Sequence, residues 1–287
     1  MPDEALLKGG NMNDMLKQIR LFLLDMDGTI YLGNDLFNGT LDFLEYVKKI
    51  GGRYIFLTNN SSKSVDKYIE KLASLGIDSD ENDFFTSTNA TIMYFEKHKY
   101  KKIYALGTRS FKEQLRAAGL NITDRLEDDI DCLCMGFDTE LTFQKLEDAC
   151  ILLGRGIDYI ATNPDWVCPT SYGYVPDCGS VSEMLYNATK RRPYFIGKPR
   201  PDIALLAMKK AGFTADETAI IGDRLYTDIA CGVNAGITSI FVLSGEGTMA
   251  DVENGETKPD HIYNNIEELY NELSQRQNEC LFYEQEK

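Results

Sequence analysis

The chain has 287 residues and a formal net charge of -15, and 43% of its residues are hydrophobic. This length suits two domains with real cores, and the negative charge argues against nucleic acid and anionic membranes as partners. No apolar run approaches the roughly 18 residues of a membrane-spanning helix, and no secretory signal is visible. The seven cysteines form no recognisable framework, so we expect reduced thiols in a cytoplasmic protein. Residues 1–18 are expected to form a polar leader ahead of a later natural start.

The first expected element is a buried strand over residues 21–24, which Asp25-Met-Asp27-Gly28-Thr29 follows. A buried strand carries no charge, so two carboxylates at its end need a reason. They fit a nucleophile with a neighbouring acid or base, both beside a bound cation. For this motif alone a solvated turn is the alternative, because short motifs of this kind occur in many loops.

Three later segments repeat the pattern of a short apolar strand followed by polar groups: Thr58-Asn59-Asn60 after residues 54–57, Lys198 after residues 194–196, and Asp223 with Asp228 after residues 219–221. In an open parallel sheet, ligands bind at the carboxyl ends of the strands, so we expect these groups to meet. Together they suit one magnesium ion and one phosphoryl group. Taken singly, Lys198 is typical of a surface lysine, and Asp223 and Asp228 are typical of helix caps.

Short apolar strands alternate with helical patterns, which predicts an α/β fold with a doubly wound, mainly parallel, Rossmann-like sheet. Helices are expected over 64–75, 201–211 and 266–273, the last followed by a polar tail, and a late strand over 238–243. From about residue 100 the alternation restarts, with strands over 103–106, 130–135 and 157–162, and with helices over 110–118, over 143–153 and from a capping box at Ser180. This block lacks charged strand ends. We therefore predict a core of residues 1–95 and 193–287 that carries an inserted α/β unit of residues 96–192, with a helix over 89–95 that fits either unit.

In order, the four polar segments resemble motifs one to four of the haloacid dehalogenase (HAD) superfamily. The long gap between the second and third is similar to that of the NagD-like (subclass IIA, 4-nitrophenylphosphatase-like) branch, which inserts an α/β cap there. Thr162-Asn163-Pro164-Asp165 and Gly179-Ser180 also resemble that cap. The likeness runs from about Arg20 to about Leu269. It departs from the family pattern at Pro176-Asp177-Cys178-Gly179, where a small, Gly-rich loop is expected.

The resemblance implies an Mg²⁺-dependent phosphatase that hydrolyses phosphomonoesters of small metabolites, sugar phosphates or nucleotide-like, through an aspartyl-phosphate. Asp25 would be the nucleophile and Asp27 the general acid and base. The metal would be held by the Asp25 carboxylate, the Asp27 carbonyl and Asp223, and Asp228 would orient the metal shell or Lys198. The phosphate would be bound by Thr58, Asn59, Asn60 and Lys198.

In the cap, the resemblance implies that Asn163, Asp165 and Trp166 form a loop that faces the substrate, and that the protein forms a homodimer through the cap. A simple Asn-Pro turn is the alternative for the loop. Gly245 to Ala250 formally matches a dinucleotide fingerprint but lacks its βαβ context, so we expect no such cofactor. Two other functions stay open: a phosphomutase on the same core, and a catalytically disabled HAD-like binding protein, against which the intact Asp27 argues.

Overall fold

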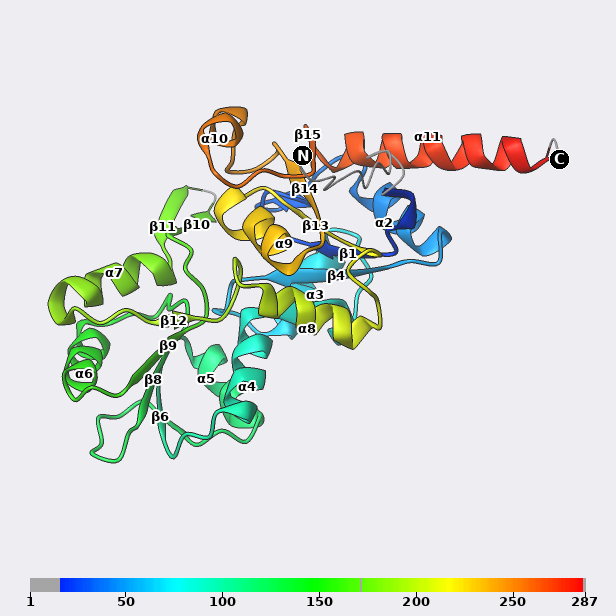
Figure 1. The fold of residues 1–287 in the computed structure, drawn as a ribbon. Coiled ribbons are helices and arrows are strands. Elements are labelled where there is room, and N and C mark those ends of the chain that lie inside the picture. Colours follow the sequence, from blue (N-terminus) through cyan, green and yellow to red (C-terminus); the bar gives the residue numbers. More distant parts are fainter. Residues whose placement is uncertain (1–15, 171, 286–287) are drawn as a thin grey trace, which may run out of the picture.

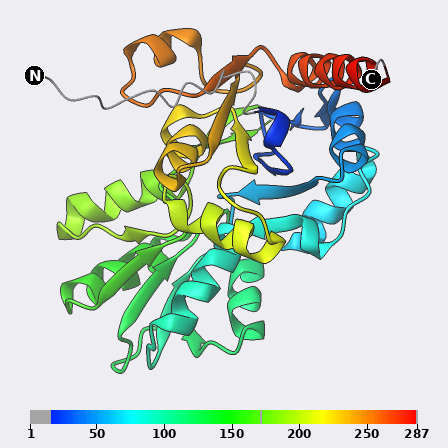
Figure 2. The same cartoon turned by 45° about the vertical axis from the view of Figure 1, so that its right-hand side comes forward.

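The computed structural model describes residues 16–170 and 172–285, so the predicted leader falls outside the described residues except for the short turn η1 (Leu16–Gln18). Strands and helices alternate along the chain and build two parallel sheets, which lie in two adjoining units (Figures 1 and 2). The predicted α/β fold is confirmed. Two antiparallel hairpins are added to it: β2 (Tyr31–Leu32) with β3 (Asp35–Leu36), and β10 (Val167–Thr170) with β11 (Gly173–Pro176).

The larger sheet has six parallel strands in the order β15-β14-β13-β1-β4-β5. Their bounds are β1 (Leu21–Leu24), β4 (Arg53–Thr58), β5 (Phe84–Thr86), β13 (Thr218–Gly222), β14 (Thr238–Val242) and β15 (His261–Tyr263). The chain runs outward from β1 to one edge and returns from β13 to the other. The crevice between β1 and β13 is therefore the topological switch point, where ligands bind in sheets of this kind.

Helices cover both faces of this sheet, which explains why β1 is apolar throughout. Phe22 and Leu24 pack into one core cluster and Leu21 and Leu23 into another, as the alternation of side chains along a strand requires. One face is covered by α2 (Thr40–Lys49), α3 (Val65–Ser74) and α11 (Ile266–Gln285), and the other by α4 (Ser87–Lys97), α8 (Pro201–Ala211) and α9 (Ala230–Ala235). The short helix α10 (Met249–Asn254) follows β14.

The smaller sheet has five parallel strands in the order β12-β9-β8-β6-β7. Their bounds are β6 (Ile103–Leu106), β7 (Ile122–Thr123), β8 (Cys132–Met135), β9 (Asp158–Ala161) and β12 (Tyr194–Phe195), and its helices are α5 (Arg109–Ala117), α6 (Phe143–Gly154) and α7 (Cys178–Thr189). The edge strand β12 lies beyond residue 192, the predicted end of the insertion. The strand that precedes Lys198 therefore pairs with β9 of the smaller sheet and not, as expected, with the larger one.

Two helix ends differ from the sequence prediction. The capping box at Ser180 is wrong, because α7 begins at Cys178 and Asp177 is its N-cap, accepting a hydrogen bond from the Cys178 N–H. The expected polar tail is wrong as well, because α11 continues to Gln285. Among the residues of α11 whose side chains the structure describes, Leu273 is the last in the core cluster, and beyond it the Glu, Gln and Arg residues favour helix by propensity.

The two units meet at the turn that follows β4. Thr108, after β6, donates to the Ser62 carbonyl at 2.9 Å, and the Phe137 N–H, after β8, donates to Ser61 Oγ at 2.8 Å. Thr162, after β9, lies 2.9 Å from the same Ser61 oxygen. The carboxyl ends of both sheets thus point at one shared turn, and α4 packs between α5 and α8 beside it.

Candidate active site

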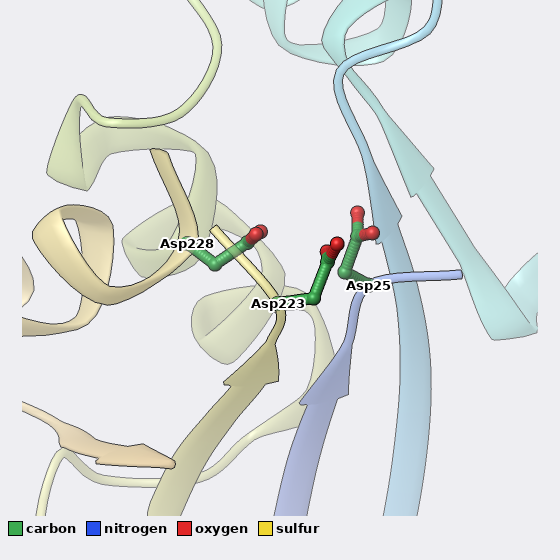
Figure 3. Close-up of side chains that lie close together, drawn as sticks. All are labelled: Asp25, Asp223 and Asp228. Atoms are coloured by element: carbon green, nitrogen blue, oxygen red, sulfur yellow. The ribbon is translucent and has the colours of Figure 1, made fainter. Parts of the chain in front are cut away.

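Two carboxylates lie at the switch point of the larger sheet. Asp25 follows β1 and Asp223 follows β13, and the parallel register of these strands places the two residues side by side. Asp228 faces them from the π-helical turn η3 (Leu225–Ile229), as Figure 3 shows. One carboxylate oxygen of each residue lies within 4.8 Å of those of the other two. The fourth predicted strand end therefore supplies two carboxylates to a single cluster.

Lys198 neutralises part of this charge from the opposite side. Its Nζ donates to Asp25 Oδ1 at 2.6 Å, to Asp228 Oδ1 at 2.5 Å and to the Leu57 carbonyl at 2.9 Å. All three protons of the ammonium group are thus used in a residue that is only 2% exposed. Burial alone would lower the pKa of Lys198, but the Asp228 and Asp25 carboxylates raise it above its usual range. Lys198 is a buried cation of the site and not the surface lysine of the alternative interpretation.

Asp223 is the carboxylate of the cluster whose two oxygens are not both hydrogen-bonded within the described residues. Its Oδ2 accepts a hydrogen bond from the Glu246 N–H at 2.7 Å, whereas Oδ1 is buried without a hydrogen-bond partner among the described residues. Burial, followed by the charges of Asp25 and Asp228, raises the pKa of Asp223 to about 8. A Cβ on Gly28 or Gly245 would clash with this carboxylate, so both glycines are needed for the chain to approach it. The cluster of oxygen donors and its uncompensated charge fit a hard divalent cation.

Asp27 lies on the turn beyond Asp25, where Gly28 takes a φ of 87°. The Tyr31 hydroxyl donates to Asp27 Oδ2 at 3.3 Å, and Lys71 Nζ lies 3.6 Å from Oδ1. Burial is the main cause that raises the pKa of Asp27, and the charge of Asp25 adds to it while Lys71 opposes it. A carboxyl group held in this way keeps its proton to a higher pH than a solvated aspartate, which suits a general acid.

Thr58 at the end of β4 and Asn59 and Asn60 in the turn after it line the same cavity. Most of their side-chain groups have hydrogen-bond partners within the protein. Thr58 Oγ1 accepts from the Asn60 N–H at 3.1 Å. Asn59 accepts from the Lys198 N–H at 2.8 Å and donates to the Lys198 carbonyl at 2.9 Å. Asn60 Oδ1 accepts from the Ser62 N–H and hydroxyl. The side chain of Asn59 thus fixes the backbone of Lys198.

The predicted cap loop is divided between the cavity and the outside. Asp165 lines the cavity and is 2% exposed, whereas Trp166 is 50% exposed. Asn163 is fully buried behind the cavity, where its Nδ2 donates to Asp165 Oδ2 at 2.8 Å and to Asp177 Oδ1 at 3.2 Å. The structure therefore brings Asp165 together with the core residues and leaves Trp166 at the surface.

Sequence reasoning did not assign several residues that line the cavity. They are Val167, Cys168 and Pro169 of β10, with Asp177, Arg224 and Thr227. A signal existed for the β10–β11 hairpin, since Gly173 separates two short strand-like runs. Arg224 lies between Asp223 and Asp228 in the fourth polar segment. A single basic residue among carboxylates is a sequence signal for an ion pair at the site. Its guanidinium donates to Asp165 Oδ1 at 2.7 Å.

Comparison with known proteins finds two family models that match different parts of the chain. A family model described as haloacid dehalogenase-like hydrolase matches residues 22–121, and a second, described as HAD-hydrolase-like, matches residues 195–269. An acid sugar phosphatase of Staphylococcus aureus (strain MRSA252) is 34% identical over 259 residues, which cover 90% of this chain and 99% of that protein. The unmatched residues between the two family models include most of the smaller sheet and the β10–β11 hairpin.

Two solved structures resemble the chain over nearly its whole described length. The 4-nitrophenylphosphatase of Thermotoga maritima has a TM-score of 0.84 and 42% identity, with 90% of this chain and 98% of that chain covered. The glycerol phosphate phosphatase of Mycobacterium tuberculosis, solved in complex with magnesium, has a TM-score of 0.83 and 28% identity, with 89% of this chain and 77% of that chain covered. Both likenesses extend across the larger and the smaller unit.

Proposed function

Because the chain is a phosphatase of the haloacid dehalogenase-like hydrolase family, in its NagD-like, 4-nitrophenylphosphatase-like branch, we propose that it hydrolyses phosphomonoesters of small metabolites with Mg²⁺ and through an aspartyl-phosphate. One observation carries this proposal. The buried Lys198 ammonium joins Asp25 to Asp228 beside an Asp223 oxygen that has no hydrogen-bond partner in the described chain. Such a site needs a cation and leaves a nucleophilic carboxylate at its edge.

In this mechanism Asp25 attacks phosphorus, the ester bond to the leaving oxygen breaks, and an aspartyl-phosphate forms. Asp27 gives its proton to the leaving oxygen and so becomes a carboxylate. It then takes a proton from the water that attacks the phosphorus of the aspartyl-phosphate, which restores Asp25 and releases inorganic phosphate. The raised pKa of Asp27 supports the first of these proton transfers.

The carboxylates of Asp25 and Asp223 and the backbone carbonyl of Asp27 would hold Mg²⁺, since oxygen ligands are those that this ion prefers. When bound, the ion supplies positive charge against the phosphoryl oxygens. Asp228 holds the Lys198 ammonium in place, and Lys198 in turn stabilises negative charge on the transferred group. The magnesium complex of the related glycerol phosphate phosphatase supports the choice of metal.

We assign phosphate binding to Thr58, Asn59, Asn60 and Lys198, with Asn59 acting through its backbone because its side chain is bonded to Lys198. Substrate choice is assigned to the cap segment that begins at the predicted loop. Val167, Cys168 and Pro169 of β10 line the cavity beside the phosphate-binding residues, Trp166 is exposed directly before them in the chain, and the buried Asn163 holds Asp165 from behind. The name of the acid sugar phosphatase relative supports a small, hydroxylated leaving group. No partner role for nucleic acid or membrane is proposed, in keeping with the net charge of -15.

Two further predictions concern the state of the enzyme. No helix in the described ranges is both long and apolar enough to cross a membrane, and the cysteines that the structure describes are free thiols. The free thiols support the proposed cytoplasmic location. Tyr172 and Tyr174 of the β10–β11 hairpin region are 81% and 63% exposed, which supports the proposal of a homodimer formed through the smaller unit.

The test is release of phosphate from 4-nitrophenyl phosphate and from a panel of phosphorylated metabolites, with Mg²⁺ and with excess chelator. We expect turnover that needs Mg²⁺ and a phosphoenzyme that acid quenching traps. Transfer of phosphate back to the substrate without release would indicate the phosphomutase. Binding without turnover would indicate the disabled scaffold, and full activity in chelator would exclude the metal-dependent mechanism.

A further inference from the structure

The loop after β9 places one carboxylate of the smaller unit among the active-site segments of the larger one. Asp165 Oδ2 accepts from Asn59 Nδ2 at 2.7 Å and from Asn163 Nδ2 at 2.8 Å, and Oδ1 accepts from Arg224 Nη1 at 2.7 Å. A carboxylate offers about four acceptor positions, so most of its capacity is used within the protein. Little of it remains for reading a substrate.

The first contact leads to the phosphate-binding lysine. The Asn59 side chain that donates to Asp165 also makes the paired hydrogen bonds to the N–H and carbonyl of Lys198. From this fixed backbone, Lys198 Nζ reaches Asp25 and Asp228. A shift of Asp165 would therefore displace Asn59 and, with it, the backbone of Lys198.

The second contact leads to the metal cluster. The Arg224 N–H donates to Asp228 Oδ2 at 3.2 Å, and Arg224 directly follows Asp223 in the chain. Arg224 Nε also lies 2.8 Å from Glu246 Oε2, an ion pair whose atoms are not aligned for a hydrogen bond. The Glu246 N–H donates to Asp223 Oδ2 at 2.7 Å. Asp165 is thus joined through Arg224 to both carboxylates that follow β13.

From this geometry we propose that Asp165 is a positioning residue that holds the segments of Asn59, Lys198 and Arg224 in register for every substrate. The inference rests on the proposed function and deepens it, because it assigns to the smaller unit a part in the phosphoryl site itself. A buried carboxylate with three strong donors fixes geometry, and catalysis is sensitive to such geometry, since a displacement of about 1 Å can cost on the order of 100-fold in rate.

The main test is Asp165→Asn, which keeps the shape of the side chain but replaces one acceptor oxygen by a donor. It should lower kcat/KM by about tenfold to a hundredfold, and by a similar factor on substrates with different leaving groups. Binding of inorganic phosphate in the presence of Mg²⁺, measured by calorimetry, should weaken as well, although phosphate has no leaving group.

The matched control is Asp148→Asn. Asp148 is a buried carboxylate of the smaller unit that accepts from the Tyr104 hydroxyl at 2.9 Å and from Gln144 at 3.0 Å, within that unit. Its variant should keep both kcat/KM and phosphate affinity even where its melting temperature falls. A second variant, Arg224→Gln, should show the same losses as Asp165→Asn, and the double variant should lose less than the product of the two.

Losses that differ strongly between substrates, with unchanged phosphate affinity, would overturn the inference and make Asp165 a specificity residue. Normal kinetics in a variant with a lowered melting temperature would overturn it in favour of a purely structural role. Wild-type protein without turnover would contradict the proposed function alone, because the calorimetric comparison of phosphate binding still decides the role of Asp165.

Discussion

The two sheets direct the carboxyl ends of their strands at the same turn but fill those ends with different side chains. In the larger sheet, strand ends carry Asp25, Thr58 and Asp223. In the smaller sheet, the corresponding positions after β6, β8 and β9 carry Gly107-Thr108, Gly136-Phe137 and Thr162, and only the edge strand β12 leads to a charged site residue, Lys198. The first set leaves one carboxylate oxygen of Asp223 without a partner among the residues that the structure describes, whereas hydroxyl and amide groups of the second set are bonded to Ser61 and Ser62.

This difference shows that lying at the carboxyl end of a parallel sheet does not by itself make a group of residues an active site. Glycines let the backbones of the two units approach closely, and the hydroxyl and amide groups there satisfy one another's hydrogen bonds. Such strand ends form a contact surface between the units. Crowded carboxylates cannot satisfy each other, and Asp223 with its raised pKa shows the cost. The unsatisfied end is the one that needs a metal and can do chemistry.

The largest effect should come from the nucleophile at the end of β1. Asp25→Asn should lower turnover of 4-nitrophenyl phosphate by at least about 1,000-fold, because an amide is not a comparable nucleophile. No phosphoenzyme should be trapped, and circular dichroism should show an intact fold because the residue lies at a strand end. Turnover within tenfold of wild type would remove the chemical distinction between the two sheets.

The strand ends of the larger sheet were predictable because each follows a run of apolar residues long enough to be recognised as a buried strand. Asp25 and Asp223 lie where those runs predict, directly after the neighbouring strands β1 and β13. Lys198 was predicted as a site residue but with the wrong sheet, because β12 has two residues and its pattern does not specify a partner strand.

The contacts between the units were not predictable in the same way. Asn59 and Asp165 are 106 residues apart, and Asp165 and Arg224 are 59 apart. Hydrophobic periodicity reports local structure and carries no information on which distant polar groups will meet. The sequence therefore indicated Asp165 as a cap residue, while its bonds to the core needed the three-dimensional structure.

Substitutions of Asp27 and Asp223 should impair the enzyme in different ways. Asp27→Asn keeps the backbone carbonyl, so its Mg²⁺ requirement should change little, while kcat should fall by about 100-fold or more on substrates with poor leaving groups. The loss in the first step should be smallest with 4-nitrophenyl phosphate, and phosphoenzyme should accumulate. Asp223→Asn removes charge from the metal cluster, so more Mg²⁺ should be needed and added metal should restore part of the activity.

Metal titrations and phosphoenzyme trapping on both variants decide these assignments. A raised Mg²⁺ requirement in Asp27→Asn together with a dependence on the leaving group in Asp223→Asn would reverse the two roles.

The docking role of the smaller sheet can be broken at Gly197, which follows β12. A Cβ at this position would clash with Asn59 Oδ1 and lie 2.7 Å from the Thr162 carbonyl. Gly197→Ala should therefore lower the free energy of unfolding by about 1–3 kcal/mol and also lower kcat, because Asn59 holds Lys198. Gly154→Ala on α6 is the control, because a Cβ at Gly154 would have no described atom within 4 Å.

The control substitution should stabilise the protein slightly and leave kcat unchanged. Equal kcat values for Gly197→Ala and Gly154→Ala would refute the coupling between the smaller sheet and Lys198.

The smallest effect concerns a carboxylate that the smaller unit does bury beside the interface. Burial, together with the charge of Asp165, raises the pKa of Asp177 to about 7. Its protonated form is thus favoured in the folded state, and its ionisation destabilises the fold as the pH rises from the unfolded value near 4 through about 7. Asp177→Asn keeps the N-cap of α7 and the acceptor for Asn163, because both contacts use Oδ1.

Relative to wild type, Asp177→Asn should therefore gain stability as the pH rises, by about 1–2 kcal/mol between pH 4 and pH 8. Urea unfolding at a series of pH values measures the difference, with Asp148→Asn again as a buried carboxylate of the same unit. A constant difference across that range would mean that Asp177 is ionised in the fold at all these pH values. The smaller unit would then hold an ionised, buried carboxylate at the interface, as the larger unit does at Asp223. The difference between the strand ends of the two sheets would in that case rest on metal binding alone.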